Sequence, residues 1–222
     1  MKKIVISLIA FVFLLYGCAT SPVKEMPVPE GGAARKSPIP QEEQETKSIN
    51  VFRELLDMSA SADDRDDVLL EMQKKYLEII NNYPDAPLAQ ESYYRLINIL
   101  LTDYYPPEFV KAESHYNDFL KRYPRSKFKY LIDTTLGTYY LKSGQWEKLS
   151  VLARDAFDDY SKSGSAGSPT LLFMYAESNY NLNNLKEAEA GYNAVIRLFP
   201  NFGDGITSKA RLEEMKSRKN RP

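Results

Sequence analysis

Few residues of this chain are of types that carry out chemistry, and the most prominent is its only cysteine. Cys18 stands at the end of an apolar run, within the segment LLYGCAT. A single cysteine cannot form an intramolecular disulfide, so three readings remain: a buried apolar side chain, a reactive thiol or a site of covalent modification. The residues that surround Cys18 decide which of these applies.

The segment before Cys18 has the pattern of a secretory signal. Met1 is followed by two lysines, residues 4–16 are apolar apart from one serine, and the small residue Gly17 directly precedes the cysteine. The apolar run is too short to span a bilayer, which needs about 20 residues. We therefore expect residues 1–17 to be a signal peptide.

The segment Leu15-Tyr16-Gly17-Cys18 resembles the bacterial lipobox, in which the cysteine thiol is diacylated and the chain is cut before it. The resemblance implies that the mature chain begins at Cys18 and is attached to the membrane by several acyl chains, which hold a protein far more firmly than one. An ordinary signal with an incidental cysteine is the alternative. Ala19, in place of an Asp, resembles the outer-membrane default of enteric bacteria, so we expect a location in the cell envelope, at the outer membrane and facing the periplasm.

Catalytic and metal-binding patterns are missing from the rest of the sequence. His115 is the only histidine, and its neighbours KAESHYND predict the solvent side of a helix. The acidic segment DDRDD at 63–67 lacks the spacing and the glycine of a calcium loop, and it suits the first turn of a helix. No glycine-rich phosphate loop, Cys/His metal spacing or serine nucleophile elbow is present. We predict a protein that is not an enzyme and has no catalytic residue, metal, cofactor or small-molecule substrate.

Composition divides the remaining chain into a tether and a folded domain. Without Lys2 and Lys3 the chain has 27 basic and 30 acidic side chains, a net charge of −3, which does not suggest a nucleic-acid partner. Residues 18–47 are rich in proline and charge and poor in large apolar side chains, so we expect a disordered tether. We expect the folded domain to occupy residues 48–222.

Within that domain the sequence repeats. An aromatic residue and a proline end an apolar helical pattern at Pro84, Pro124 and Pro200, at intervals of 40 (84 to 124) and 76 (124 to 200) residues. A degenerate copy without the proline is expected around Ser161. A period of about 40 residues is typical of a helical array.

The spacing inside each repeat predicts pairs of helices. Apolar residues recur at i, i+3, i+4 and i+7, and small residues at Gly137 and Ala176 allow a neighbouring helix to approach closely. Ser168 is expected to cap one helix, and Asn184 to cap another in a capping box with Glu187.

These features resemble the tetratricopeptide repeat family. The residues that carry the resemblance are Leu136, Gly137, Tyr140, Gly144 and Trp146 in one copy, and Leu172, Ala176, Ala188, Tyr192 and Pro200 in another. The resemblance implies an all-α, tetratricopeptide-like superhelical array of about four helix pairs plus a C-terminal capping helix. That last helix, at 206–218, should use Ile206, Ala210 and Met215 as its apolar stripe. An unrelated helical bundle is the alternative.

In this family a concave groove, lined by the first helix of each pair, binds protein partners. Carried over by phase, the partner-binding residues are Glu91, Tyr94, Asn98, Thr134, Thr138, Lys142, Phe173, Glu177, Tyr180 and Asn181. Tyrosine and phenylalanine offer a large contact area at low entropic cost, and asparagine can bind a peptide main chain. The alternative is that several of these residues pack between repeats.

Among lipoproteins with such repeats, the chain resembles the BamD (YfiO) type of outer-membrane assembly factor. The segments YPDAPLAQESYYRL and YPRSKFKY share that group's tyrosine-proline followed by a short polar turn and a helix. The resemblance implies a membrane-anchored periplasmic scaffold with protein partners, either peptides or folded domains, and outer-membrane protein assembly as one task. A pilus-assembly pilotin and a cell-wall or division coordinator are the alternatives, and an envelope enzyme is a third class.

Overall fold

The computed structural model describes residues 38–219, and these residues form nine α-helices and no strand. Cys18 and the expected signal peptide lie outside the described residues. The helices are α1 (Gln41–Ser61), α2 (Leu69–Asn82), α3 (Pro87–Thr102), α4 (Phe109–Arg122), α5 (Phe128–Ser143), α6 (Trp146–Ser163), α7 (Pro169–Asn181), α8 (Leu185–Leu198) and α9 (Gly203–Lys219). The predicted all-α array of four helix pairs and one final helix is thereby confirmed.

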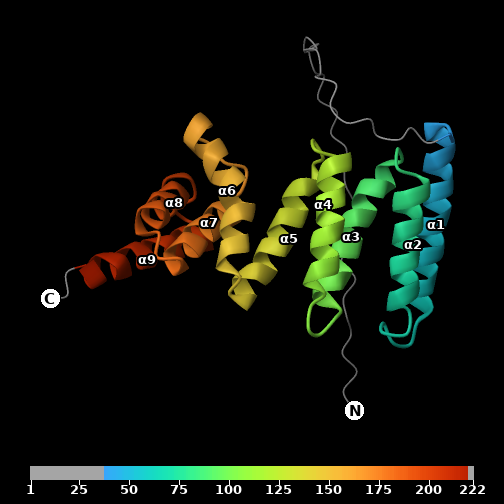
Figure 1. The fold of residues 1–222 in the computed structure, drawn as a ribbon, viewed down its shortest axis with the longest axis horizontal. Helices are drawn as coiled ribbons and strands as arrows, with labels where there is room; N and C mark the ends of the chain where they lie inside the picture. The colour runs from blue at the N-terminus through green and yellow to red at the C-terminus, as the bar shows by residue number, and fades with distance from the viewer. Residues whose placement is uncertain (1–37, 220–222) are drawn as a thin grey trace, which may run out of the picture. The chain divides into compact units, whose positions relative to one another are not determined.

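The helices follow one another through space in chain order, from α1 to α9 (Figure 1). The first helices of the pairs form a continuous row, because α1 contacts α3, α3 contacts α5, α5 contacts α7 and α7 contacts α9. We call the surface over this row the first-helix face. The second helices α2 and α6 each contact the first helix of the next pair, and α8 contacts α9.

Proline determines where three of the second helices end. The helices α2, α4 and α8 stop at Asn82, Arg122 and Leu198, two residues before a proline whose ring would clash with a continuing helix. Helix α6 has no such proline and continues to Ser163, where Gly164 ends it in the left-handed conformation at φ 71°. The degenerate copy expected near Ser161 is therefore the end of a longer helix.

The first helix begins earlier than composition predicts. Helix α1 starts at Gln41, before the expected domain boundary at Ser48, and both Gln44 and Ser48 are fully buried. The reason is a side-chain bond over long sequence distance: the Gln44 amide donates to Asp85 Oδ2 at 2.9 Å and accepts from the Asp85 backbone N–H at 3.0 Å. A polar composition therefore does not prevent this segment from packing on the first repeat.

The predicted helix caps were half right. Ser168 accepts the Leu171 backbone N–H at 3.2 Å, as expected. Asn184 lies at the N-cap of α8 but makes no capping bond; its side-chain nitrogen donates to Asn179 Oδ1 at 3.1 Å. The prediction that DDRDD forms the first turn of a helix was also wrong: α2 begins at Leu69, and residues 63–67 form the preceding turn.

The core runs through the array, and buried or half-buried tyrosines link its helices. One apolar cluster extends from Leu55 in α1 to Tyr175 in α7. At several helix contacts a tyrosine hydroxyl donates to a carboxylate; the pairs are Tyr93 with Asp118, Tyr116 with Asp133, Tyr140 with Glu113 and Tyr192 with Glu177. Burial and the neighbouring carboxylate raise the pKa of each of these four phenols.

The final helix covers the last repeat with a different stripe from the one predicted. In α9 the small residues Gly205 and Ser208 are buried, and Leu212 and Met215 pack near Tyr192. Ile206 and Ala210 are exposed instead, so the prediction was wrong for these two residues. Gly205 lies against the backbone of Phe199 and Pro200 in the turn after α8, and the neighbouring Ile206 side chain faces solvent.

Candidate partner-binding site

The first-helix face has a hollow between α1, α2 and α3, with a volume of about 290 Å³. Two of the predicted groove residues, Tyr94 and Asn98, line it together with Leu56 and Ser59 of α1. Its remaining lining residues are Leu55, Arg65, Met72, Tyr76, Arg95 and Ile99. The hollow therefore combines buried apolar side chains with polar groups that can orient a ligand.

Two arginines lie at this hollow, and each is held in place. Arg95 pairs with Glu91 at 2.6 Å, and its guanidinium lies 5.2 Å from the centre of the Phe52 ring. Burial would lower the pKa of Arg95, but the hydrogen bond and charge of Glu91 outweigh it and raise this pKa. Glu91 thus positions a guanidinium at the hollow. Arg65 pairs in the same way with Asp103 at 2.7 Å.

The predicted residues of α5 lie on the same row of helices and are partly exposed. Thr134 donates to the Tyr130 carbonyl at 2.9 Å, and Thr138 donates to the Thr134 carbonyl at 2.8 Å. Both hydroxyls are therefore used within the helix and keep only acceptor capacity for a partner. Lys142 is exposed and its ammonium lies 5.3 Å from the centre of the Tyr139 ring.

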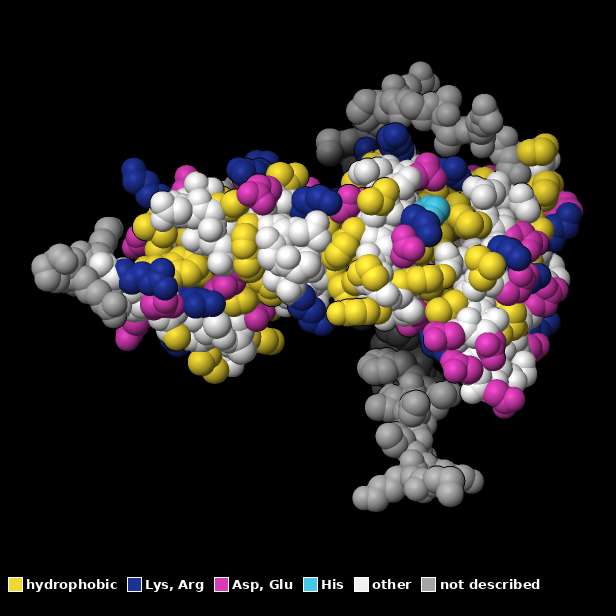
Figure 2. All heavy atoms as spheres, turned by 60° about the horizontal axis from the view of Figure 1, so that its bottom comes forward, with side chains coloured by type: hydrophobic (Ala, Val, Ile, Leu, Met, Phe, Trp, Pro, Cys, Tyr) yellow, Lys and Arg dark blue, Asp and Glu magenta, His cyan; other side chains and the backbone are white. Residues whose placement is uncertain are grey.

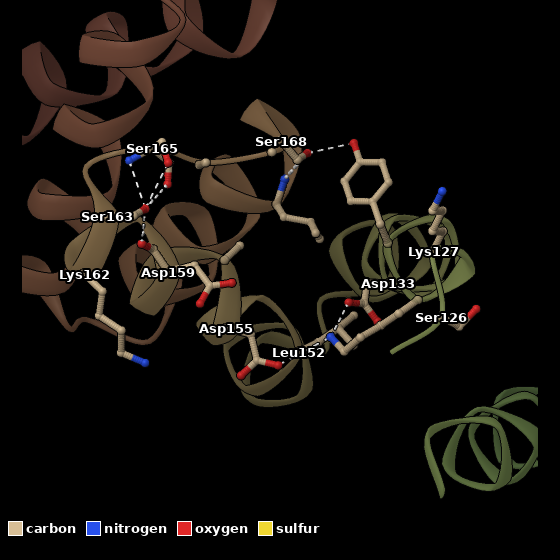
Figure 3. Close-up of a pocket in the computed structure, with 16 residues that line it drawn as sticks. Ser126, Lys127, Asp133, Leu152, Asp155, Asp159, Lys162, Ser163, Ser165 and Ser168 are labelled. Carbon is tan, nitrogen blue, oxygen red and sulfur yellow. Dashed lines mark hydrogen bonds and ion pairs between the residues drawn. The ribbon is translucent and has the colours of Figure 1, made fainter. Parts of the chain in front are cut away.

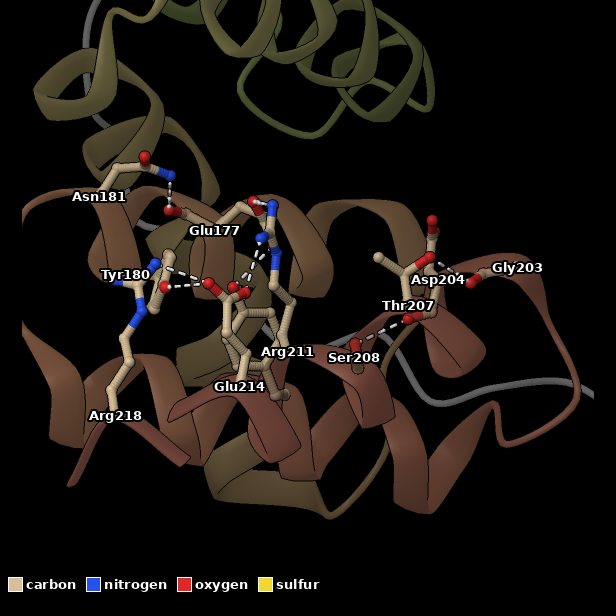
Figure 4. A network of polar contacts seen from close by, with 11 residues as sticks. Glu177, Tyr180, Asn181, Gly203, Asp204, Thr207, Ser208, Arg211, Glu214 and Arg218 are labelled. Atoms are coloured by element: carbon tan, nitrogen blue, oxygen red, sulfur yellow. Dashed lines mark hydrogen bonds and ion pairs between the residues drawn. The ribbon is translucent and has the colours of Figure 1, made fainter. Parts of the chain in front are cut away.

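The predicted residues of α7 have partners within the chain. Glu177 is 5% exposed; it accepts the Tyr192 hydroxyl at 2.7 Å and pairs with Arg211 of α9 at 2.8 Å. Tyr180 donates to Glu214 at 3.2 Å (Figure 4). Helix α9 thereby engages both side chains.

The other two predicted positions of α7 differ in exposure. Phe173 is half-buried, with its ring centre 6.2 Å from that of Tyr192. Asn181 is exposed, although its amide donates to the Glu177 carbonyl at 2.8 Å. The open part of the first-helix face is consequently formed by α1, α3 and α5, and α7 contributes least to it.

A larger hollow, of about 620 Å³, opens between the start of α5, the end of α6 and the start of α7 (Figure 3). It exists because α6 continues past the point where the other second helices stop. Asp133 lies at its edge, almost fully buried, and pairs with Lys129 at 2.7 Å. Burial raises the pKa of Asp133, although Lys129 and the Tyr116 hydroxyl oppose the rise. Asp133 and Lys129 neutralise each other, and no sequence pattern indicates this hollow.

His115 is half-buried rather than on the solvent side as predicted, and burial lowers its pKa. Within residues 38–219 no group of three or more His, Cys, Asp or Glu side chains is arranged to hold a metal ion. Among the helices of that same range, none is both long and apolar enough to cross a bilayer.

The residues of α1 at the hollow were missed by sequence reasoning. Leu56 and Ile49 are seven positions apart in α1 and both are about half exposed, which is a helical stripe open to solvent. The first helix lacks the small-residue pair of the later repeats. Its groove-facing positions therefore could not be assigned by alignment with those repeats. The seven-residue spacing of its apolar residues Ile49 and Leu56 is the sequence feature that could have indicated this surface.

Comparison with known protein families identifies one segment of the chain. Residues 170–201 match the tetratricopeptide repeat family, and this segment contains most of α7 and all of α8. The chain therefore contains a tetratricopeptide repeat within an all-α helical-repeat array. Searches of curated proteins and of solved structures found no significant match.

Tetratricopeptide arrays typically act as scaffolds for protein–protein interaction and have no enzymatic activity of their own, since stacked repeats present extended binding surfaces. The repeat supports protein partners for this chain.

Proposed function

We propose that this protein is a lipid-anchored scaffold of the bacterial cell envelope that binds a protein partner on its first-helix face. The observation that carries the binding role is the hollow between α1 and α3, where Tyr94 and Asn98 meet an apolar floor. Support for the anchor comes from the lipobox-like segment at Cys18. Outer-membrane protein assembly is the task that we propose for the scaffold, on the basis of its resemblance to BamD-type lipoproteins.

The hollow is suited to one large side chain of a bound segment. Its floor contains Leu55, Met72 and Ile99, which would desolvate an apolar side chain. Asn98 can donate to and accept from a peptide main chain at the rim. A partner that places one apolar residue here and extends along α3 and α5 would contact the predicted residues Thr134, Thr138 and Lys142 of α5.

Site-specific photocrosslinking in cells tests the binding role. A photoreactive residue in place of Tyr94 should capture a partner that mass spectrometry identifies, whereas one in place of the exposed Val151 on α6 should capture little. Asn98→Ala combined with Leu56→Ala should reduce capture at position 94. Equal capture at positions 94 and 151 would argue against a binding site on the first-helix face.

The identity of the captured protein tests the task. An outer-membrane assembly component supports our proposal, while a pilus secretin or a cell-wall synthesis factor would replace it with one of the other envelope roles.

Fractionation tests the anchor separately. Cys18→Ser should move the protein from the detergent-extracted membrane fraction to the soluble periplasmic fraction without changing its helical circular dichroism, because the acyl chains provide the membrane affinity. If the variant stayed in the membrane fraction, the anchor at Cys18 would be wrong and the binding role would be unaffected.

A further inference from the structure

A second exposed surface lies where the α1–α2 turn meets the α3–α4 turn. One contact joins the two turns, Arg65 Nη2 to Asp103 Oδ2 at 2.7 Å, and a second joins α2 to the α3–α4 turn, from Gln73 Nε2 to the Tyr104 hydroxyl at 2.5 Å. Because both turns are fixed to each other, their exposed side chains form one continuous surface.

Apolar side chains are unusually exposed on this surface. Tyr105 is fully exposed, Val110 is 81% exposed and Leu70 is 63% exposed, and none of the three lines the hollow between α1 and α3. We call these three residues the turn-edge patch. Figure 2 shows hydrophobic side chains gathered on the face formed by the turns of this part of the array. Clustered exposed apolar residues mark interaction sites, and tyrosine is among the residues that contribute most at interfaces.

The charge beside the turn-edge patch is strongly negative. Asp63, Asp64, Asp66 and Asp67 are exposed, and within the described residues none of them forms an ion pair. The single cation of this turn, Arg65, is already paired with Asp103. The acidic side chains at this end of the array are visible in Figure 2. Four carboxylates therefore remain available to an incoming positive charge.

We propose that the turn-edge patch and the four aspartates dock a basic amphipathic helix of a protein partner. The apolar stripe of such a helix would cover Tyr105 and Val110, and its Lys and Arg side chains would face residues 63–67. An amphipathic helix presents both kinds of side chain on adjacent faces, as this surface requires. Charge complementarity would increase the association rate and would be screened by salt. Nucleic acids and anionic lipid surfaces are excluded by the same four carboxylates.

The first experiment measures fluorescence anisotropy of a labelled 18-residue amphipathic peptide of leucine and lysine, titrated with the full chain. The acid variant replaces Asp63, Asp64, Asp66 and Asp67 by Asn. Its matched control replaces Glu147, Glu187, Glu189 and Glu213, which are exposed acids elsewhere, by Gln. At low salt the acid variant should bind the peptide about tenfold more weakly. This is the combined effect expected from the loss of four exposed ion pairs, each of which contributes little. The matched control should bind as the unmodified chain does.

The second experiment tests the apolar part of the surface. Tyr105→Ser with Val110→Ser should weaken peptide binding at both low and high salt, since burial of apolar area is not screened. The control Val151→Ser removes an exposed apolar side chain of α6, at 73% exposure, and should have no effect. All these positions are exposed, so circular dichroism should show unchanged folding for every variant.

Three results would overturn the proposal. The acid variant and its matched control could bind equally, or a peptide of leucine and glutamate could bind as well as the lysine peptide. Sedimentation could instead show that the chain self-associates and that the acid variant abolishes this, in which case the occupant is a second copy. The proposal does not rest on the first-helix face or on the lipid anchor, and the photocrosslinking and fractionation experiments described above leave it unaffected.

Discussion

Replacing Gly191 by alanine should destabilise the array because a methyl group has no room there. A Cβ atom at Gly191 of α8 would lie 2.9 Å from Ala176 Cβ and 3.1 Å from Ala176 Cα of α7. It would also lie 3.1 Å from Tyr175 Cδ1. Since one neighbour is backbone, the strain can be relieved only if α7 and α8 move apart.

Gly137 of α5 provides a matched comparison. A Cβ atom there would lie 2.6 Å from Met174 Sδ, which is nearer than any neighbour of Gly191. Methionine is flexible, however, and its sulfur can move away by rotation within the side chain. The two glycines therefore differ in what must move to make room for a methyl group: a flexible side chain at Gly137 and a helix backbone at Gly191. The shorter distance is at Gly137, where the neighbouring atom moves more easily.

The magnitudes follow from two opposing effects. Alanine is favoured over glycine in a helix interior by about 1 kcal/mol, and overpacking a well-packed contact costs about 1 to 3 kcal/mol. At Gly137 the two should nearly cancel, giving a change within about 0.5 kcal/mol. At Gly191 the packing cost should exceed the propensity gain and leave a net loss of about 1 to 2 kcal/mol.

Urea unfolding followed by circular dichroism measures both changes on chains that differ by one methyl group. Gly191→Ala should lower the urea midpoint, and Gly137→Ala should leave it nearly unchanged, with the same slope for both. If Gly137→Ala were the more destabilising of the two, the reasoning from the mobility of the neighbouring atom would be refuted.

Further substitutions test three other contacts of the array. Arg211→Met leaves the buried Glu177 without its cation and should lower the free energy of unfolding in urea by about 2 kcal/mol. This loss is smaller than that expected for a fully buried ion pair because Arg211 is partly exposed. Adding Glu177→Gln should restore part of the lost stability. Burial raises the pKa of Tyr123 to about 12 from 10.0. The stability that this group contributes is present below pH 10 and is lost as pH rises toward 12, by about 3 kcal/mol. Tyr123→Phe, which loses the hydrogen bond to the Pro84 carbonyl, should reduce that alkaline slope, and an unchanged slope would contradict the assignment. Gly205→Ala would place a methyl group against the Phe199 carbonyl oxygen. It should lower the free energy of unfolding by about 3 kcal/mol and speed amide hydrogen exchange in α9. Unchanged exchange protection in α9 would disprove this close packing.

Sequence periodicity was sufficient for the order of the helix pairs because most repeats contain at least one local signal. The small residues at Gly137 and Ala176, together with the prolines that follow the second helices, determine the helix pairs locally. Ser168 could be recognised as a cap because its bond reaches only three residues along the chain.

The features that sequence reasoning missed depend on contacts between distant residues. The early start of α1 depends on Gln44 meeting Asp85, and the occupied state of Glu177 depends on Arg211. The local spacing of residues predicts which helix face they share. Only the packed array shows which distant side chain forms a bond with each of them.

The loop between α6 and α7 is a suitable position for splitting the chain or for inserting another domain. In this loop an added Cβ would meet no atom within 4 Å at Gly164 or at Gly167, and of the two only Gly164, at φ 71°, has a backbone conformation that favours glycine. The helices on either side nevertheless contact each other directly. The backbone could therefore be severed here into two pieces that recombine without a covalent link, or a reporter domain could be inserted between them. Such an insertion would place a reporter beside the 620 Å³ hollow, where it could sense occupancy of the last two repeats without altering a helix.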